Sequence, residues 1–519
     1  MSKLNTRGKN VTTNIRTVAA RRGEQLGYSA NGNLQFKKEP LQMLYELTVS
    51  TLFGKSTFYK SSDTLVKELK KHVAAAVADD AMDFVANLAI HARTEMNIRT
   101  MPIVLVVEFA NELRKQGKLY QNTRQLVCDV IQRADQITDL YAYALEVFGS
   151  KNKVPMAIKR GVADAFNKFG EYNFAKYNRD GAVKFRDVLR IVHPEAKDAR
   201  QGMIFEKIMK ETLEAPYTWE VELSKNGQLP PAERKSKAAL WTELVMSGKV
   251  GYMALLRNMR NVVEAGVDSS VLRHLANTLS EPENVLKSKQ LPFDFVEAYK
   301  IVKPLNGALA TAVSQAIDVS VGNLPELGKK IWVIIDYSGS MGQDDGVPIN
   351  TATLLAASLL KAAGRTAEDI SVTLFGSAAK TLKGIDTNNS VLGIQRELLT
   401  HRRGNIAGST DFGAALREYG SLGFVPDTIV VFTDGEVNRF PYAHVKALGN
   451  KAVKLTVNLA AASTTPMSPC DGWFAVAGWS SAMFKWIPAI RNKETVVDAL
   501  AVPYIGLPRK TVASFQEGE

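Results

Sequence analysis

The sequence predicts a protein of two parts, an all-α helical array followed by a doubly wound α/β domain with a parallel sheet. Three observations support this prediction. The 519 residues suffice for about two to four domains of ordinary size. From about residue 39 to residue 315, apolar residues recur at the three- and four-residue spacing of amphipathic helices. From about residue 330 onwards, strand-like and helical stretches alternate as in βαβ units.

The helical part reads as a run of short helices separated by polar breaks. The clearest stretches are residues 39–54, 63–78, 81–92, 101–117, 123–134 and 137–149. Pro102 fits the first turn of its helix, and Gly149 falls where a helix should stop. Because consecutive helices without strands stack into pairs, we expect an α-solenoid.

The α/β part begins with KKIWVIID at residues 329–336, an apolar run typical of a buried parallel strand. Helix 350–364, strand 370–378, helix 411–420 and strands 427–436 and 451–460 follow in alternation. We therefore assign residues 1–38 to a basic N-terminal arm, 39–325 to the helical domain and 326–519 to the α/β domain.

The formal net charge of +12 is concentrated in two stretches. Residues 1–50 carry a surplus of +5 and residues 151–200 a surplus of +6, so the rest of the chain is nearly balanced. A clustered positive surplus is typical of a protein that binds a polyanion, although a solvated basic face that keeps the protein soluble is the alternative.

Several classes of protein are excluded or disfavoured. The basic N-terminus lacks the apolar core of a secretory signal, and no stretch reaches the roughly 18 apolar residues of a membrane span, so we expect a soluble cytoplasmic protein. Two cysteines are too few for a disulfide framework or a four-cysteine zinc site. The six histidines show no HExxH spacing, and no phosphate-binding lysine loop is present, so we expect no enzyme activity.

Oxygen-bearing side chains follow the strands of the α/β part. Asp336, Ser338 and Ser340 come directly after the first strand, Asp434 ends the strand TIVVFT, and Thr410 lies in a loop between them. Since ligands bind at the carboxyl ends of parallel strands, these residues should meet there. Carboxylates, hydroxyls and waters suit Mg²⁺ or a similar divalent cation. The pattern resembles the metal-ion-dependent adhesion site of von Willebrand factor A domains, which implies an open coordination position for a partner's acidic group.

The second basic stretch combines cations with aromatic rings. A helix beginning near residue 154 carries Lys159 and Arg160, and a second cluster comprises Lys176, Arg179, Lys184, Arg186, Arg190 and His193. Lys and Arg bind phosphates, whereas Tyr and His can stack on unpaired bases, so this mixture favours RNA as the partner.

Three stretches, KRGVAD at 159–164, the run 176–194 and MALLRNMRNV at 253–262, resemble the Ro autoantigen family with its TROVE domain. The resemblance implies a monomeric ring of HEAT-like helical repeats, with a Rossmann-like von Willebrand factor A domain clamping its ends. It implies that the outer surface binds a Y or Y-like RNA and that a positive hole accepts single-stranded ends of misfolded non-coding RNA. It further implies a role in RNA quality control, in some cases with an exoribonuclease tethered through the RNA, and it marks Lys176, Arg179 and His193 as primary RNA contacts.

The alternative is a metal-dependent protein-interaction adaptor. In that case the α/β domain grips an acidic partner and the helical array is another protein-binding surface. Such an adaptor would not need the positive surplus of residues 151–200.

Overall fold

The fold is described from a computed structural model. It covers residues 15–29, 32–50, 62–178, 181–214, 217–342, 347–401, 408–437, 452–459, 464–468, 471–477 and 495–507, together with Leu448, Phe484, Ile487 and Arg491. Among these residues, no helix is long and apolar enough to cross a membrane.

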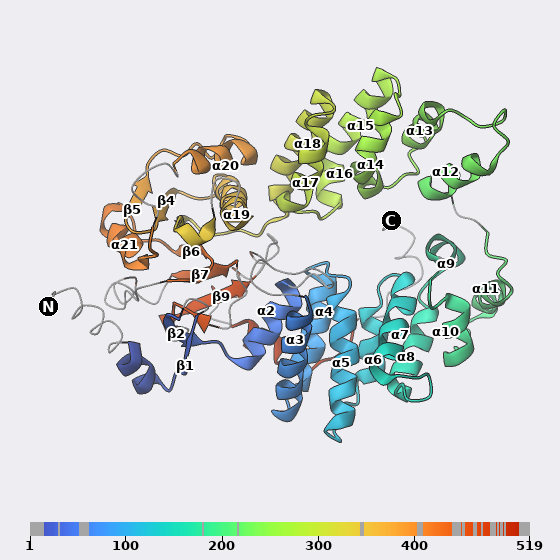
Figure 1. Ribbon diagram of the computed structural model, residues 1–519, viewed down its shortest axis with the longest axis horizontal. Coiled ribbons are helices and arrows are strands. Elements are labelled where there is room, and N and C mark those ends of the chain that lie inside the picture. The colour runs from blue at the N-terminus through green and yellow to red at the C-terminus, as the bar shows by residue number, and fades with distance from the viewer. Residues whose placement is uncertain are drawn as a thin grey trace.

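The helical array forms an arc with two arms (Figure 1). The first arm contains α2 (Pro40–Ser50), α3 (Ser62–Ala78), α4 (Met82–Thr94), α5 (Met101–Lys115), α6 (Thr123–Val130), α7 (Asp135–Phe148), α8 (Met156–Phe166), α9 (Glu171–Tyr177), α10 (Phe185–Val192) and α11 (Ala199–Lys210). The second arm contains α13 (Lys237–Met246), α14 (Tyr252–Glu264), α15 (Ser269–Ser280), α16 (Pro282–Lys287), α17 (Pro292–Val302) and α18 (Gly307–Ser320). Between them lies α12 (Trp219–Gln228), which buries none of its residues.

Local signals set the helix ends in the first arm. Pro102 lies in the first turn of α5, where its missing N–H costs nothing, and α5 is buried along most of its length. Gly149 ends α7 in the left-handed conformation, with φ of 76°. α6 ends at Val130 and is therefore shorter than the predicted stretch 123–134.

The second part, which we call the sheet domain, contains a six-stranded sheet of order β5-β4-β3-β6-β7-β9. The strands are β3 (Lys330–Asp336), β4 (Asp369–Phe375), β5 (Ala379–Leu382), β6 (Thr428–Thr433), β7 (Val453–Asn458) and β9 (Trp473–Ala477). Helices α19 (Val347–Ala363) and α20 (Val391–Thr400) share a core with one face, and α21 (Phe412–Arg417) packs on the other. The domain also contains the short 3₁₀ helices η2 (Gly339–Met341) and η3 (Glu418–Ser421), and η1 (Val321–Asn323) precedes it.

The predicted doubly wound α/β fold with a parallel sheet is confirmed, since every strand pair of the six-stranded sheet is parallel except the pair at one edge. Edge strand β5 runs antiparallel to β4, because a tight turn after Phe375 returns the chain beside the strand it has just left. Strands β5 and β9 were both missed. β5 (AKTL) is short and half polar, so it lacks the continuous apolar run that marks the central strands. β9 (WFAVA) is apolar, but it is only five residues long, and an apolar run that short does not distinguish a strand from a buried helix.

Both chain ends tie the sheet domain to the first arm. Residues 26–37, expected to form a basic arm, instead form the hairpin β1 (Leu26–Tyr28) and β2 (Leu34–Lys37), and β2 pairs with β8 (Thr464–Thr465). On the other side, residues 495–507, which include α24 (Val496–Leu500), lie along α4 and α6. We call this second segment the C-terminal strap.

The strap is held by side chains of the first arm. The Tyr504 hydroxyl donates to Asp129 Oδ2 at 2.6 Å, and the Leu507 N–H donates to the same oxygen at 2.8 Å. Asn87 Nδ2 donates to the Val502 carbonyl at 2.7 Å. Since α18 leads through η1 directly into β3, the sheet domain contacts both ends of the arc.

Candidate functional site

Four arginines from both arms of the arc are linked by electrostatic interactions: Arg93 with Arg99 and Arg133, and Arg99 with Arg133 and Arg257. Arg93 belongs to the last turn of α4, Arg99 to the loop before α5, Arg133 to the loop before α7, and Arg257 to α14. Because α14 belongs to the second arm, the group lies where the two arms face each other (Figure 1). We call these four residues the inner arginine cluster.

The cluster is electrostatically strained. Burial, followed by the charges of Arg99 and Arg133, lowers the pKa of Arg93 to about 10. Burial and then the charges of Arg133 and Arg257 also lower the pKa of Arg99. Arg133 differs: although burial lowers its pKa, the hydrogen bond and charge of Asp135 raise it overall. A polyanion would stabilise the charged forms of Arg93 and Arg99.

Carboxylates offset only part of this charge. Arg133 Nε donates to Asp135 Oδ1 at 2.6 Å, and Arg133 Nη2 bonds the second oxygen of the same carboxylate. Asp294 of α17 lies within electrostatic reach of Arg257. The pKa values of Arg93 and Arg99 are nevertheless lowered, first by burial and then by the neighbouring arginines, whose effect on each is larger than that of Asp135.

Aromatic rings adjoin the cluster at the end of α9. The Arg133 guanidinium lies 4.9 Å from the centroid of the Tyr177 ring. Lys176 Nζ lies 5.6 Å from the same ring and 5.4 Å from the ring of Tyr172, which is 47% exposed. Interleaved cations and rings suit single-stranded RNA, whose unpaired bases stack while its phosphates pair with cations.

The structure separates the RNA contacts predicted from the sequence. Lys176 joins the inner arginine cluster through Tyr177. Arg179 falls outside the described residues. The others lie at two helices, with Lys159 and Arg160 on α8. Lys184 comes directly before α10, Arg186 and Arg190 lie on it, and His193 follows its last residue.

These outlying residues differ in their surroundings. Arg160, Arg190 and His193 are exposed. Arg186 is ion-paired instead, with Nη1 2.6 Å from Glu211 Oε2 and Nε 3.7 Å from Asp187 Oδ1. The basic surface around α8 and α10 therefore contains both available and neutralised cations.

The inner arginine cluster itself was missed by sequence reasoning. Arg93, Arg99, Arg133 and Arg257 all lie outside the stretch 151–200 that carries the positive surplus, and only folding brings them together. For Arg257 a signal existed, because it lies within the stretch 253–262 that carries the family resemblance.

A second charged site lies at the carboxyl ends of β3 and β6. Asp336 and Asp434 are both fully buried there. Asp336 accepts hydrogen bonds from the Ser338 N–H at 2.8 Å and from the Thr433 hydroxyl at 2.7 Å. Burial, followed by the charge of Asp434, raises the pKa of Asp336 to about 7. We call these two residues the carboxylate pair.

The remaining predicted metal ligands lie beside the carboxylate pair. Ser338 Oγ and Ser340 Oγ are 3.1 Å apart. The Gly339 N–H donates to the Gly408 carbonyl at 3.2 Å, which brings the loop containing buried Thr410 against the same segment. No group of three His, Cys, Asp or Glu side chains that could hold a metal ion occurs among the described residues. Two carboxylates with hydroxyl oxygens nevertheless fit a hard divalent cation, because such a cation prefers oxygen ligands and would offset the like charges of a buried pair.

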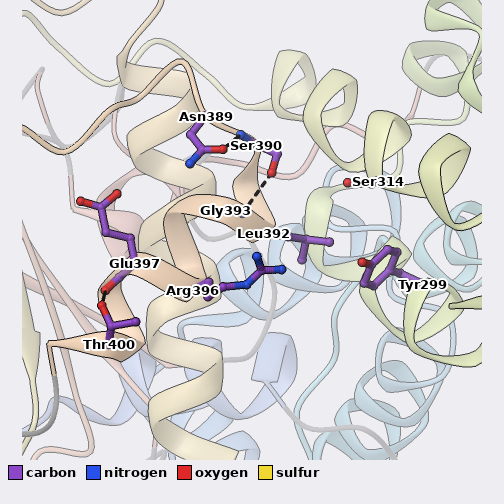
Figure 2. A pocket seen from close by; sticks show the side chains of 9 residues that line it. All are labelled: Tyr299, Ser314, Asn389, Ser390, Leu392, Gly393, Arg396, Glu397 and Thr400. Carbon is purple, nitrogen blue, oxygen red and sulfur yellow. Dashed lines mark hydrogen bonds between the residues drawn. The ribbon is translucent and has the colours of Figure 1, made fainter. Parts of the chain in front are cut away.

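A pocket of about 380 Å³ lies where α20 meets the second arm (Figure 2). In it, Arg396 of α20 points toward Tyr299 of α17, whereas Glu397 points away. The first turn of α20 is already capped, because the Gly393 N–H donates to Ser390 Oγ at 3.0 Å and the Val391 N–H donates to Asp318 Oδ1 at 2.7 Å. We interpret this pocket as the joint between the array and the sheet domain.

An arc of helical repeats with a cationic cluster between its arms, joined at both ends by an α/β domain, defines a class of polyanion-binding repeat proteins. A model of the TROVE domain matches residues 32–212 and 206–324, which together span more than half of the chain. The chain belongs to the TROVE-domain family, whose members bind RNA in ribonucleoprotein particles.

The similar proteins agree with this assignment. The crystal structure of Deinococcus radiodurans Ro (RSR) protein has the same fold, with a TM-score of 0.60 and 17% identity over 88% of this chain and all of that one. Telomerase protein component 1 of Mus musculus is 33% identical over 102 residues, and that of Rattus norvegicus is 32% identical over 102 residues. The match spans 20% of this chain and 4% of those relatives.

Proposed function

We propose that this protein binds single-stranded ends of misfolded or damaged non-coding RNA at the inner arginine cluster. The observation that carries the proposal is the convergence of Arg93, Arg99, Arg133 and Arg257 from two arms of one arc. An RNA strand between the arms would supply the phosphates that relieve their mutual repulsion, and each neutralised phosphate would release condensed counterions. The exposed ring of Tyr172 offers a stacking surface for a base beside Lys176.

A second RNA surface completes the proposal. Arg160, Arg190 and His193 are exposed on α8 and at α10, and they would contact a small structured RNA of the Y or Y-like kind. Such an RNA would regulate or tether the protein, for example to an exoribonuclease. The protein itself would act in RNA quality control by binding, without chemistry of its own.

The sheet domain would add a metal-dependent contact. Asp336, Ser338, Ser340, Thr410 and Asp434 would hold Mg²⁺ or another divalent cation, directly or through water. When bound, the cation would neutralise the carboxylate pair and present a Lewis-acidic position to a partner's carboxylate. The domain would then resemble the von Willebrand factor A domain anticipated from the sequence.

Photocrosslinking tests the RNA proposal. The full chain is mixed with a 4-thiouridine-labelled single-stranded RNA of about ten nucleotides, irradiated, and digested for mass spectrometry. Crosslinked peptides are expected from the α4–α5 loop, the α6–α7 loop, α9 and α14. A blunt duplex of the same length should compete poorly. Crosslinks confined to the sheet domain, or equal competition by the duplex, would contradict the proposal.

A further inference from the structure

A buried amide lies inside the inner arginine cluster. Gln136, in the first turn of α7, is 1% exposed. Its Oε1 accepts hydrogen bonds from Arg93 Nε and Arg93 Nη2, each at 3.3 Å, and from the Gln132 N–H at 2.9 Å. Its Nε2 donates to the Arg99 carbonyl at 3.1 Å. One side chain therefore links the end of α4, the α4–α5 loop and the α6–α7 loop.

The amide orients Arg93 without neutralising it. Two donors on the same edge of the guanidinium meet the single oxygen Oε1, so the orientation of the group is constrained. Within the described part of the chain, its remaining N–H groups have no hydrogen-bond acceptor. Arg133 differs, because the carboxylate of Asp135 holds it on two oxygens and offsets its charge. At position 136 a neutral acceptor preserves the positive potential that a carboxylate would reduce.

The same amide also restrains Arg99. Arg99 is exposed, and its side chain leaves a loop rather than a helix. The bond from Gln136 Nε2 to the Arg99 carbonyl fixes the backbone from which that side chain projects. Preorganised donors bind an anion better than mobile ones, because less conformational entropy is lost on binding.

We propose that Gln136 is a positioning residue for RNA binding. It orients the Arg93 guanidinium and the loop that bears Arg99 for contact with phosphate, and as a neutral side chain it does not reduce their positive charge. The proposal rests on the proposed function of the inner arginine cluster. It assigns Gln136 an effect on affinity that acts through Arg93 and Arg99.

Gln136→Leu tests the positioning role against a matched control. Gln201 is also a buried glutamine of the first arm, 3% exposed, but its Nε2 donates to the Phe166 and Phe169 carbonyls at 3.0 Å and 3.2 Å. Gln201→Leu therefore removes a comparable buried amide away from the cluster. We expect Gln136→Leu to weaken binding of a ten-nucleotide single-stranded RNA about tenfold, since a charge-assisted contact is lost. Gln201→Leu should change it less than twofold after correction for the folded fraction.

Two further readouts separate positioning from a merely structural role. The slope of log K against log salt should become shallower by about 0.7 in Gln136→Leu, the value for one lost phosphate contact on a single strand. Arg93→Ala should show a similar loss, and the double variant Gln136→Leu with Arg93→Ala should lose clearly less than the sum of the two single losses, because only the effect through the Arg99 loop remains to be added. Fully additive losses would overturn the positioning role.

A second variant, Gln136→Glu, tests the positioning role if Gln136→Leu folds poorly. The carboxylate retains an acceptor for Arg93 and for the Gln132 N–H but adds a negative charge, so we expect a loss of about tenfold in affinity. Wild-type affinity in this variant would overturn the requirement for neutrality. If wild-type protein itself binds no single-stranded RNA, the proposed function and this inference fall together. If wild type binds and Arg99→Ala weakens binding while both Gln136 variants resemble Gln201→Leu, only the positioning role falls.

Discussion

The inner arginine cluster and the carboxylate pair are both groups of like charge, but they differ in sign and exposure. The arginines come from loops and helices of two arms, and Arg99 and Arg257 are exposed. Asp336 and Asp434 are fully buried at the ends of adjacent strands. A partly exposed cluster of cations suits an extended polyanion, whereas a buried pair of carboxylates suits a small cation. The two proposed sites therefore suit ligands of opposite charge, and we expect them to act as independent binding devices.

Removing two arginines should give the largest effect. Arg99→Ala together with Arg257→Ala takes one cation from each arm, and we expect affinity for a ten-nucleotide single-stranded RNA to fall about 100-fold at 0.1 M salt. The measurement is fluorescence anisotropy over a salt series, in which the slope should become shallower by about 1.4.

Arg260→Ala is the matched control for this pair. Arg260 lies on α14 with Arg257, but its Nε is 3.8 Å from Glu264 Oε1 at an exposed position. We expect its loss to change affinity less than twofold, because the neighbouring carboxylate already offsets its charge. Equal losses for Arg257 and Arg260 would show that general positive charge, rather than the cluster, determines binding.

Removing one charge from the carboxylate pair should stabilise the protein when no metal is present. In chelator, Asp434→Asn should stabilise the protein by about 1 kcal/mol, because it removes a like charge beside buried Asp336. The asparagine can still accept the Glu436 N–H, which Asp434 Oδ1 accepts at 3.0 Å. The variant should also lose the rise in melting temperature that Mg²⁺ or Mn²⁺ is expected to give the wild type.

Two comparisons accompany the Asp434 experiment. Asp369→Asn alters a partly exposed carboxylate 3.6 Å from Lys330 and should retain the cation response. RNA affinity should be unchanged in Asp434→Asn if the two devices are independent. If neither Mg²⁺ nor Mn²⁺ raises the melting temperature of the wild type, this site does not bind the metal.

The carboxylate pair could be predicted from the sequence because its determinants are local. Asp336 directly follows an apolar strand, and Asp434 ends another. The carboxyl ends of parallel strands meet by necessity, so the motif order alone placed these side chains together. The proximity of Thr410 followed from the same logic, although the bond from Gly339 to Gly408 that brings it close is visible only in the structure.

The inner arginine cluster could not be predicted in this way. Arg99 and Arg257 are far apart in the chain, and their proximity depends on the accumulated curvature of many stacked helices. Helical periodicity predicts which face of each helix is buried, but it does not predict how an arc bends. The charge surplus at 151–200 includes Lys176, which adjoins the cluster, and also Arg186, whose ion pair with Glu211 no local pattern reveals.

The C-terminal strap belongs to neither device, so weakening it should affect stability alone. Tyr504→Phe removes the hydroxyl that donates to Asp129 Oδ2 at 2.6 Å, although the Leu507 N–H still donates to that oxygen. We expect a loss of about 1 kcal/mol, seen as earlier proteolysis of the strap and a lower first melting transition. Tyr28→Phe, at a tyrosine that is 64% exposed, is the control. A large fall in RNA affinity would instead show that strap docking shapes the inner arginine cluster.

The smallest effect on RNA binding is expected on α10, where the ion-paired Arg186 and the exposed Arg190 lie one turn apart. Arg190→Ala should weaken binding of a structured Y-like RNA about threefold to tenfold, because Arg190 is exposed and would contact phosphate. Arg186→Ala should change it less than twofold, since Glu211 already lies 2.6 Å from its guanidinium. A filter-binding assay with both variants makes the comparison directly. If Arg186 proves the more important of the two, its ion pair with Glu211 must open when RNA binds. Glu211→Gln should then strengthen binding, because the competing carboxylate has been removed.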